Sequence, residues 1–241
     1  MQNDPTLMSM SPRPYFDEPP PLEEEVLLWF GVAGAYWEHD GNPLKPHAEL
    51  TSGLCSNGYF DVPRLLSYPN MAELLGRLLA SKLKNAGIQR TYPGQVDWVI
   101  SSAYSAITFG HEVAKALGAR FANVEKDPTD ESQRRMLWRR LTLPVDSRVL
   151  QVEELITTMG TAQEVKRAVQ EGNEEQIEFL SVIGVLVLRP SNLEAMKRQH
   201  QIVALVEKEI WTKKPEECPL HAAGSKAFKP KTHWAQLTGK G

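Results

Sequence analysis

Two adjacent carboxylates, followed by a turn rich in hydroxyl groups, are the residues of this chain best suited to chemistry. Glu153 and Glu154 come directly after the apolar run 149–152, and the sequence Thr157-Thr-Met-Gly-Thr161 follows them. Carboxylates accept hydrogen bonds from neighbouring sugar hydroxyls or bind a hydrated Mg²⁺. Hydroxyls and N–H groups at the start of a helix bind a phosphate. The sequence predicts a sugar-phosphate site here, and a generic strand, turn and helix with an acidic end is the alternative.

Alternating apolar segments predict the elements that must position these groups. Periodicity and helix-stop glycines favour helices at 22–30, 70–86, 107–117 and 162–171 and strands at 96–100, 121–124, 149–152 and 182–188. Asn70 and Glu73 match a capping box at the start of the second helix. Strands that alternate with helices indicate an α/β fold with a parallel sheet flanked by helices. Because ligands bind beyond the carboxyl ends of such strands, Ser101, Lys126 and Glu153 are expected to meet there.

The run 148–161 resembles the signature of type I phosphoribosyltransferases, in which a hydrophobic strand precedes two acids, an aliphatic residue and Thr-Thr-Gly-Gly-Thr. Here both acids are Glu rather than the usual Asp, and Met159 stands where the first glycine is usual. The resemblance covers residues 29–188 and is nearest to the orotate-specific members. It implies an N-terminal hood segment and a C-terminal extension around the sheet.

Two further segments carry the resemblance. Residues 48–61 are similar to the family segment in which Leu-Lys-Ser-Gly precedes a Ser and an aromatic pair, and that segment forms part of the base and diphosphate pocket. Thr51 replaces the lysine, and Ser52 and Gly53 follow it. Residues 95–107 look like the strand and loop that bind diphosphate, with Ser101 and Ser105 where glycines are common.

Residues 121–140 depart most from the family, which places a flexible catalytic loop with Arg-Lys and Lys-x-His-Gly there. Lys126 matches the lysine of the first pair, Glu125 replaces its arginine, and Lys-x-His-Gly does not follow. Four arginines occupy the region instead, at positions Arg134, Arg135, Arg139 and Arg140. They are candidates for binding diphosphate, and a solvated charged face is the alternative.

The resemblance implies transfer of ribose 5-phosphate from 5-phosphoribosyl 1-diphosphate to a nucleobase nitrogen, with orotate the first candidate acceptor. It also implies Mg²⁺ as cofactor, no direct protein metal ligand and a homodimer. Lys126, Glu153 and Glu154 are the expected catalytic residues. The expected substrate-binding residues are Thr51, Ser52, Gly53, Ser101, Ser102, Ala103, Tyr104, Thr157, Thr158, Met159, Gly160 and Thr161. Because the catalytic loop is altered, a non-catalytic regulator that binds phosphoribosyl diphosphate or nucleotides on the same fold is the second hypothesis.

The composition limits which other classes of protein the chain could belong to. The 241 residues carry a net charge of −3, which favours neither nucleic acid nor a membrane surface. Two cysteines are too few for a disulfide framework, no apolar stretch reaches the ~20 residues of a membrane span, and the N-terminus does not resemble a signal peptide. We therefore expect a cytoplasmic protein.

The expected organisation is a Pro-rich flexible arm (1–21), a phosphoribosyltransferase-like domain (22–210) and a C-terminal extension (211–241). In the extension, Cys218 and His221 form half of a zinc pattern. Since no second pair follows them at a usual spacing, metal binding is not the favoured interpretation.

Overall fold

The computed structural model describes residues 7, 22–88, 95–132 and 134–239. Most of the predicted N-terminal arm therefore lies outside the described residues. Leu7 is the exception: its side chain is buried, and its carbonyl accepts a hydrogen bond from the Asn70 amide at 2.5 Å.

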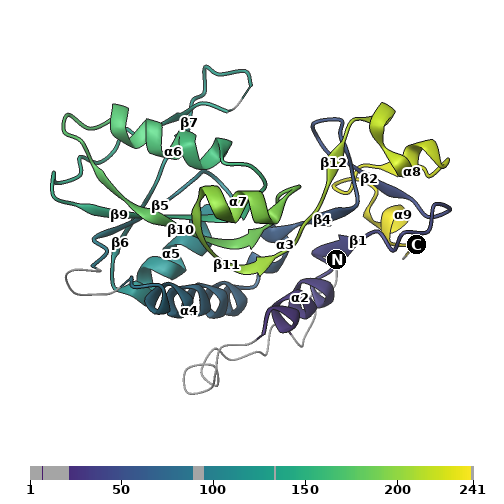
Figure 1. The fold of residues 1–241 in the computed structure, drawn as a ribbon. Helices are drawn as coiled ribbons and strands as arrows, with labels where there is room; N and C mark the ends of the chain where they lie inside the picture. The colour runs from purple at the N-terminus through teal and green to yellow at the C-terminus, as the bar shows by residue number, and fades with distance from the viewer. Residues whose placement is uncertain (1–6, 8–21, 89–94, 133, 240–241) are drawn as a thin grey trace.

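A five-stranded parallel sheet forms the centre of the molecule (Figure 1). Its strands, in spatial order, are β11 (Gln201–Glu207), β10 (Glu178–Leu188), β9 (Arg148–Ile156), β5 (Trp98–Ser101) and β6 (Arg120–Asn123). Four of them correspond to predicted strands. β11 was not predicted, and β9 continues four residues past the apolar run because its hydrogen-bonded ladder with β10 extends to Ile156. The predicted parallel sheet is confirmed.

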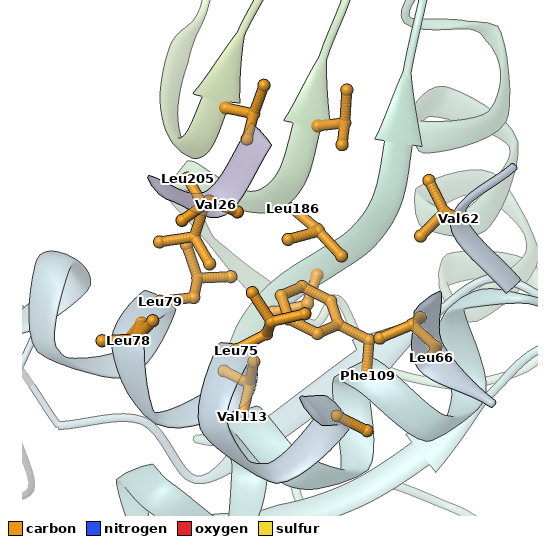
Figure 2. Close-up of a cluster of buried hydrophobic side chains, with 14 of the residues drawn as sticks. Val26, Val62, Leu66, Leu75, Leu78, Leu79, Phe109, Val113, Leu186 and Leu205 are labelled. Carbon is orange, nitrogen blue, oxygen red and sulfur yellow. The ribbon is translucent and has the colours of Figure 1, made fainter. Parts of the chain in front are cut away.

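Helices cover both faces of this sheet. On one face lie α2 (Glu23–Val32), α4 (Pro69–Asn85) and α5 (Ala106–Leu117), whose apolar side chains pack on the strands in a large core (Figure 2). On the other face, α6 (Gly160–Glu171) and α7 (Leu193–Gln199) cover two smaller clusters. Val99 belongs to the first core, and its neighbours Trp98 and Ile100 belong to the second. This alternation shows that the central strand is buried on both sides, as a parallel sheet requires.

The predicted capping box at the start of α4 is wrong. The helix begins at Pro69 after Tyr68, whose side chain makes no capping hydrogen bond. Proline at a first helical position supplies a preset φ and lacks the N–H that a cap would satisfy. Glu73 instead pairs with Arg77 at 2.6 Å.

Two glycines that were expected to end helices do so for different reasons. Gly118 adopts a left-handed φ of 70° after α5, which is the usual glycine cap. Gly172 follows α6 with φ −90°, a conformation open to any residue. At this position a Cβ atom would lie 2.6 Å from the carbonyl oxygen of Trp138, so close packing rather than backbone conformation requires glycine.

A second, smaller sheet joins the N-terminal hood (residues 36–60) to the C-terminal extension. Its strand order is β12 (Thr212–Lys213), β3 (Cys55–Ser56), β2 (His47–Glu49) and β13 (Ala227–Phe228). The hood also contains the hairpin-like pair β1 (Tyr36–Glu38) and β4 (Gly58–Phe60), and α3 (Val62–Leu66) leads from it to α4. Figure 1 shows the extension, with α8 (Pro219–Ala222) and α9 (Trp234–Thr238), beside these strands.

Among the described residues, no helix combines the length and the hydropathy that crossing a bilayer requires.

Candidate active site

The strand order places the candidate site where the chain changes direction across the sheet. From β5 the chain adds β6 on one side, then returns to add β9 on the other side of β5. Ligands of open α/β sheets bind at such a switch point, outside the carboxyl ends of the strands. The loop after β5 and the end of β9 both lie there, because Ser101 pairs with Val152. The expected convergence of Ser101 and Glu153 is confirmed.

Glu153 is enclosed at this junction. Its side chain is 1% exposed, and its two oxygens accept hydrogen bonds from the Ser102 hydroxyl at 2.5 Å and the Gln151 amide at 2.9 Å. Burial raises the pKa of Glu153 to about 7, although both hydrogen bonds oppose the rise. Glu153 is therefore a carboxyl that changes protonation near neutral pH and ties the β5 loop to β9.

Glu154 has different surroundings. It is half-buried, and although burial raises its pKa, a hydrogen bond from Ser105 and the charge of Lys126 favour its ionised form. Successive side chains of a strand point to opposite faces, so the two acids face different groups. The expectation that both would lie past the end of the strand is wrong, since both belong to β9. Glu154 is the more accessible carboxylate for a sugar hydroxyl or a hydrated cation.

Residues 157–159 connect β9 to α6, which Gly160 and Thr161 begin, and this is where the anion seat is predicted. Gly160 begins α6, so the first N–H groups of this helix have no partner within it and are available to a phosphate. Thr157, Thr158, Gly160 and Thr161 all line one groove with a volume of about 1290 Å³. Met159 has φ −82°, which needs no glycine, and its half-buried side chain packs against the cluster under α7. Methionine in place of the glycine usual in the family therefore does not block the predicted anion seat.

The end of β5 and the loop after it contain the other predicted diphosphate ligands. Ser101, Ser102 and Ala103 are buried, whereas Tyr104 is 72% exposed, and the peptide bond between Ala103 and Tyr104 is cis. Ser101 fits where the family often has glycine because Gly110 of α5 lies opposite, with a Cβ position 3.0 Å from the Ser101 Cβ.

The segment that departs from the family is a compact hairpin. Strands β7 (Glu125–Lys126) and β8 (Met136–Leu137) pair antiparallel. Between them, Asp127 accepts hydrogen bonds from the N–H and hydroxyl of Thr129, and an oxygen of Asp130 accepts from the N–H groups at 134 and 135. The turn is held by its own aspartates, in contrast to the long loop that the family resemblance suggested.

The four arginines divide between two cavities. Arg134 and Arg135 line the large groove together with Ser52, Thr157 and Thr158, but the Arg135 guanidinium also lies 3.6 Å from Asp127. Arg139 and Arg140 line a separate cavity of about 420 Å³ beside Tyr104. Arg140 pairs there with Glu125, the residue that replaces the family arginine. Lys126 lines both cavities.

Of the predicted hood residues, only Ser52 lines the groove. Thr51, Ser52 and Gly53 are all exposed and form the tight turn between β2 and β3, in which Gly53 has φ 79°. The turn reaches from the hood toward residues 157–161. The hood therefore forms one wall of the groove, and the connection from β9 to α6 forms another.

Arg189 is a further candidate site residue that sequence reasoning missed. It directly follows β10, and its backbone N–H donates to the carbonyl of Ile156 at 2.8 Å, beside the anion seat. The side chain is 7% exposed, and its Nε and Nη1 atoms are buried without a hydrogen-bond partner among the described residues. Burial lowers its pKa, opposed by nearby Tyr59 of the hood. A buried guanidinium remains charged and is costly without an anion. In the sequence, a single arginine after an apolar strand does not by itself indicate a binding site.

Relatives of known name identify the family. An orotate phosphoribosyltransferase of Pelotomaculum thermopropionicum is 34% identical over 196 residues, which span 81% of this chain and 94% of that protein. Another, from Nitratiruptor sp., is 31% identical, with 80% of this chain and 95% of that protein covered. The chain belongs to the orotate phosphoribosyltransferase family. The resemblance on residues 29–188 is thereby confirmed, although no family model matches the chain.

Solved structures show the same fold at lower identity. Leishmania donovani UMP synthase has a TM-score of 0.53 at 18% identity, covering 76% of this chain and 36% of that one. The orotate phosphoribosyltransferase of Aeropyrum pernix has a TM-score of 0.50 at 19% identity, covering 75% of this chain and 92% of that one. These likenesses agree with the parallel, helix-flanked sheet of this member of the family.

Proposed function

We propose that this protein is an enzyme that transfers the 5-phosphoribosyl group from 5-phosphoribosyl 1-diphosphate to a ring nitrogen of orotate, releasing diphosphate, in pyrimidine nucleotide synthesis. The observation that carries the proposal is the family relationship, at 31–34% identity across nearly the whole length of the relatives. The regulator hypothesis is not favoured, because these relatives are named as transferases.

The residues at the switch point supply the required interactions. Glu154 accepts hydrogen bonds from the ribose hydroxyls, and residues 157–161 bind the 5-phosphate through hydroxyls and helix N–H groups. As the bond between C1 and the diphosphate breaks, the ribose gains positive charge and the leaving group gains negative charge. Lys126 neutralises the departing diphosphate, which is bound by the loop after β5. Such positioning and charge stabilisation supply most of the catalysis.

Arg189 is the residue that we assign to the acceptor base. Its Nε and Nη1 atoms are buried without a hydrogen-bond partner among the described residues, its backbone N–H pairs with Ile156 at the end of β9, and Tyr59 of the hood lies nearby. Orotate differs from uracil by a carboxylate, and a guanidinium binds a carboxylate through parallel hydrogen bonds. Arg189 would thus select orotate and satisfy its own buried charge.

The donor set at the site also fits a magnesium ion carried by the substrate. Carboxylate and hydroxyl oxygens at Glu154, Ser105 and residues 157–161 are the hard ligands that Mg²⁺ prefers. Bound to the diphosphate, the ion would lower the charge of the leaving group. Glu154 is the residue positioned to hold it through water.

A homodimer in the cytoplasm remains our expectation for the working enzyme. Light scattering tests the first point by giving the molar mass. Mixing Glu154→Gln with Lys126→Met subunits would show which subunit supplies the lysine to each site. A lysine acting across the dimer would restore part of the activity, whereas a lysine acting within its own subunit would restore none.

The test of the proposed function is nucleotide formation by the purified chain. Phosphoribosyl diphosphate and Mg²⁺ are incubated with orotate, uracil, adenine or hypoxanthine, and the products are separated by chromatography. The proposal expects orotidine 5′-monophosphate and diphosphate in equal amounts, with the other bases far slower. Turnover of another base instead of orotate would reject the proposed acceptor. Tight binding of phosphoribosyl diphosphate without any turnover would reject the transferase.

A further inference from the structure

Two histidines and two cysteines from opposite ends of the sequence meet between the hood and the C-terminal extension. His47 lies in β2, Cys55 in β3, Cys218 directly before α8, and His221 within α8. The Nε2 atom of His47 lies 3.3 Å from the Cys55 sulfur and 3.8 Å from the Cys218 sulfur. Ligand atoms of His47, Cys55 and His221 all lie within 4.8 Å of one another. We call these four residues the His–Cys cluster.

Three members of the cluster are buried, and His221 lies on its solvent side. His47 is 0% exposed and each cysteine is 1% exposed, whereas His221 is exposed. Both cysteines are free thiols in the structure. Three groups with metal-binding atoms therefore lie within 4.8 Å of one another at the margin of the small sheet, and the Cys218 sulfur lies beside them, 3.8 Å from the His47 Nε2 atom.

Hydrogen bonds fix His47 in the form that a metal ligand needs. The Ser225 hydroxyl donates to the carbonyl of Lys45 at 2.6 Å, so its single proton is used. The same oxygen lies 2.8 Å from the His47 Nδ1 atom and must accept a hydrogen bond from it. In neutral imidazole the proton is then on Nδ1, and the Nε2 lone pair points at the two sulfurs. A metal-bound histidine usually donates such a hydrogen bond from its other ring nitrogen.

The spacing also matches tetrahedral zinc. With Zn–S of about 2.3 Å and Zn–N of about 2.0–2.1 Å, a sulfur and a nitrogen on the same ion lie about 3.6 Å apart. The two distances from His47 bracket this value. The backbone N–H of His221 also points at the Cys218 sulfur, at 3.4 Å. This hydrogen bond would stabilise a thiolate at that position.

We propose that His47, Cys55, Cys218 and His221 bind one structural zinc ion. Binding displaces one proton from each thiol, so two protons are released and the charges of the ion and two thiolates cancel. A neutral site suits a buried position. Since four protein ligands fill a tetrahedral shell, no position is left for substrate, and the role is structural.

The site would add a link between the hood and the C-terminal extension, which the small sheet and the contact of Trp234 with Tyr59 also connect. Cys55 follows the 51–53 turn, whose Ser52 lines the groove, and Cys218 directly precedes α8 in the C-terminal extension. By binding Cys55, zinc would hold the 51–53 turn in place on the side away from the groove. The inference is independent of the proposed function, because it concerns metal content and stability rather than turnover.

The first test is the metal content of untagged, full-length protein purified from zinc-supplemented cells without chelators, measured by mass spectrometry. We expect about one zinc per chain. Replacement by Co²⁺ should give the absorption bands of a tetrahedral cobalt ion with a thiolate charge-transfer band. This spectrum requires no variant and remains decisive if substitutions prevent folding. Metal-free protein with two titratable thiols, or with a disulfide between Cys55 and Cys218, would overturn the proposal.

Variants locate the metal. Cys218→Ser and His221→Ala should each lower zinc affinity by about tenfold or more and should lower the unfolding temperature only while zinc is present. His111→Ala is the matched control, because His111 is exposed on α5 and distant from the cluster. Equal zinc content and affinity in Cys218→Ser, His221→Ala and the control would place the ion elsewhere and overturn the assignment.

Discussion

Replacing Arg189 with methionine should weaken substrate binding and stabilise the ligand-free protein at the same time. Methionine has similar length and no donors, so the substitution removes a buried charge and the two unpartnered nitrogen atoms, Nε and Nη1. Replacing buried ionic groups by apolar side chains of similar volume is often stabilising, here by about 1–2 kcal/mol. For a chain of this size the unfolding temperature should rise by about 2–8 °C.

The loss of binding follows from the hydrogen bonds that orotate would make. Each hydrogen bond to a charged partner contributes about 1.5–3 kcal/mol. Two such bonds amount to about 3 kcal/mol or more, which is roughly a hundredfold in affinity. The loss should appear for orotate and for orotidine 5′-monophosphate, both of which have the carboxylate. It should be absent for uridine 5′-monophosphate, which lacks it.

The assay combines inhibition by the two nucleotides with thermal unfolding of the ligand-free protein. Arg77→Met is the control, because Arg77 lies on α4 and makes a partly exposed pair with Glu73. Removing such a pair costs about 0.3–0.5 kcal/mol and should leave both inhibition constants unchanged. If Arg189→Met weakens both nucleotides equally, or destabilises the ligand-free protein, Arg189 is a structural residue and the reasoning is refuted.

Four further predictions address the rest of the site and its support. Glu154→Gln should raise the KM for phosphoribosyl diphosphate about tenfold or more, because it removes a charged hydrogen-bond acceptor. The free energy of unfolding of this variant should match that of the wild type. Lys126→Met should lower kcat by a comparable factor with the KM for orotate unchanged, since the lysine acts on the leaving group. Burial raises the pKa of Glu153 from 4.5 to about 7, so its protonated form stabilises the fold fully below about pH 4.5. This contribution, about 3 kcal/mol, is lost as pH rises through 7. In urea denaturation from about pH 5 to pH 8, the free energy of unfolding should therefore fall less for Glu153→Gln than for the wild type. Gly172→Ala should lower the free energy of unfolding by about 1–3 kcal/mol, because its Cβ would lie 2.6 Å from the Trp138 carbonyl oxygen, whereas Gly31→Ala in open space on α2 should raise it by about 0.5–1 kcal/mol.

Four strands of the central sheet and their parallel arrangement were predictable because local patterns determine them, whereas β11 and the strand order were not predicted. Short apolar runs mark the strands, helical periodicity marks α4 and α5, and glycine after α5 marks its end. The acids and hydroxyls at 153–161 were found because a local segment contains them all. Where the local pattern was incomplete, the prediction was wrong: the apolar run stops at Val152, although pairing with β10 continues β9 to Ile156.

Features that depend on distant segments could not be predicted. The chemical importance of Arg189 depends on being buried without a partner near Tyr59, which is a property of packing and not of neighbouring sequence. The same holds for the His–Cys cluster. Cys218 and His221 were recognised as half of a metal pattern, but the second half lies more than 160 residues earlier and is brought to them by the small sheet.

The most direct test of the central claim is the initial rate at which orotate is converted to orotidine 5′-monophosphate with phosphoribosyl diphosphate and Mg²⁺. The wild-type chain and Glu154→Gln are compared at equal concentration. We predict product formation matched by diphosphate release for the wild type, and a rate at least about tenfold lower for the variant at subsaturating phosphoribosyl diphosphate. Orotate left unconsumed by correctly folded wild-type protein would contradict the claim that this chain is an orotate phosphoribosyltransferase.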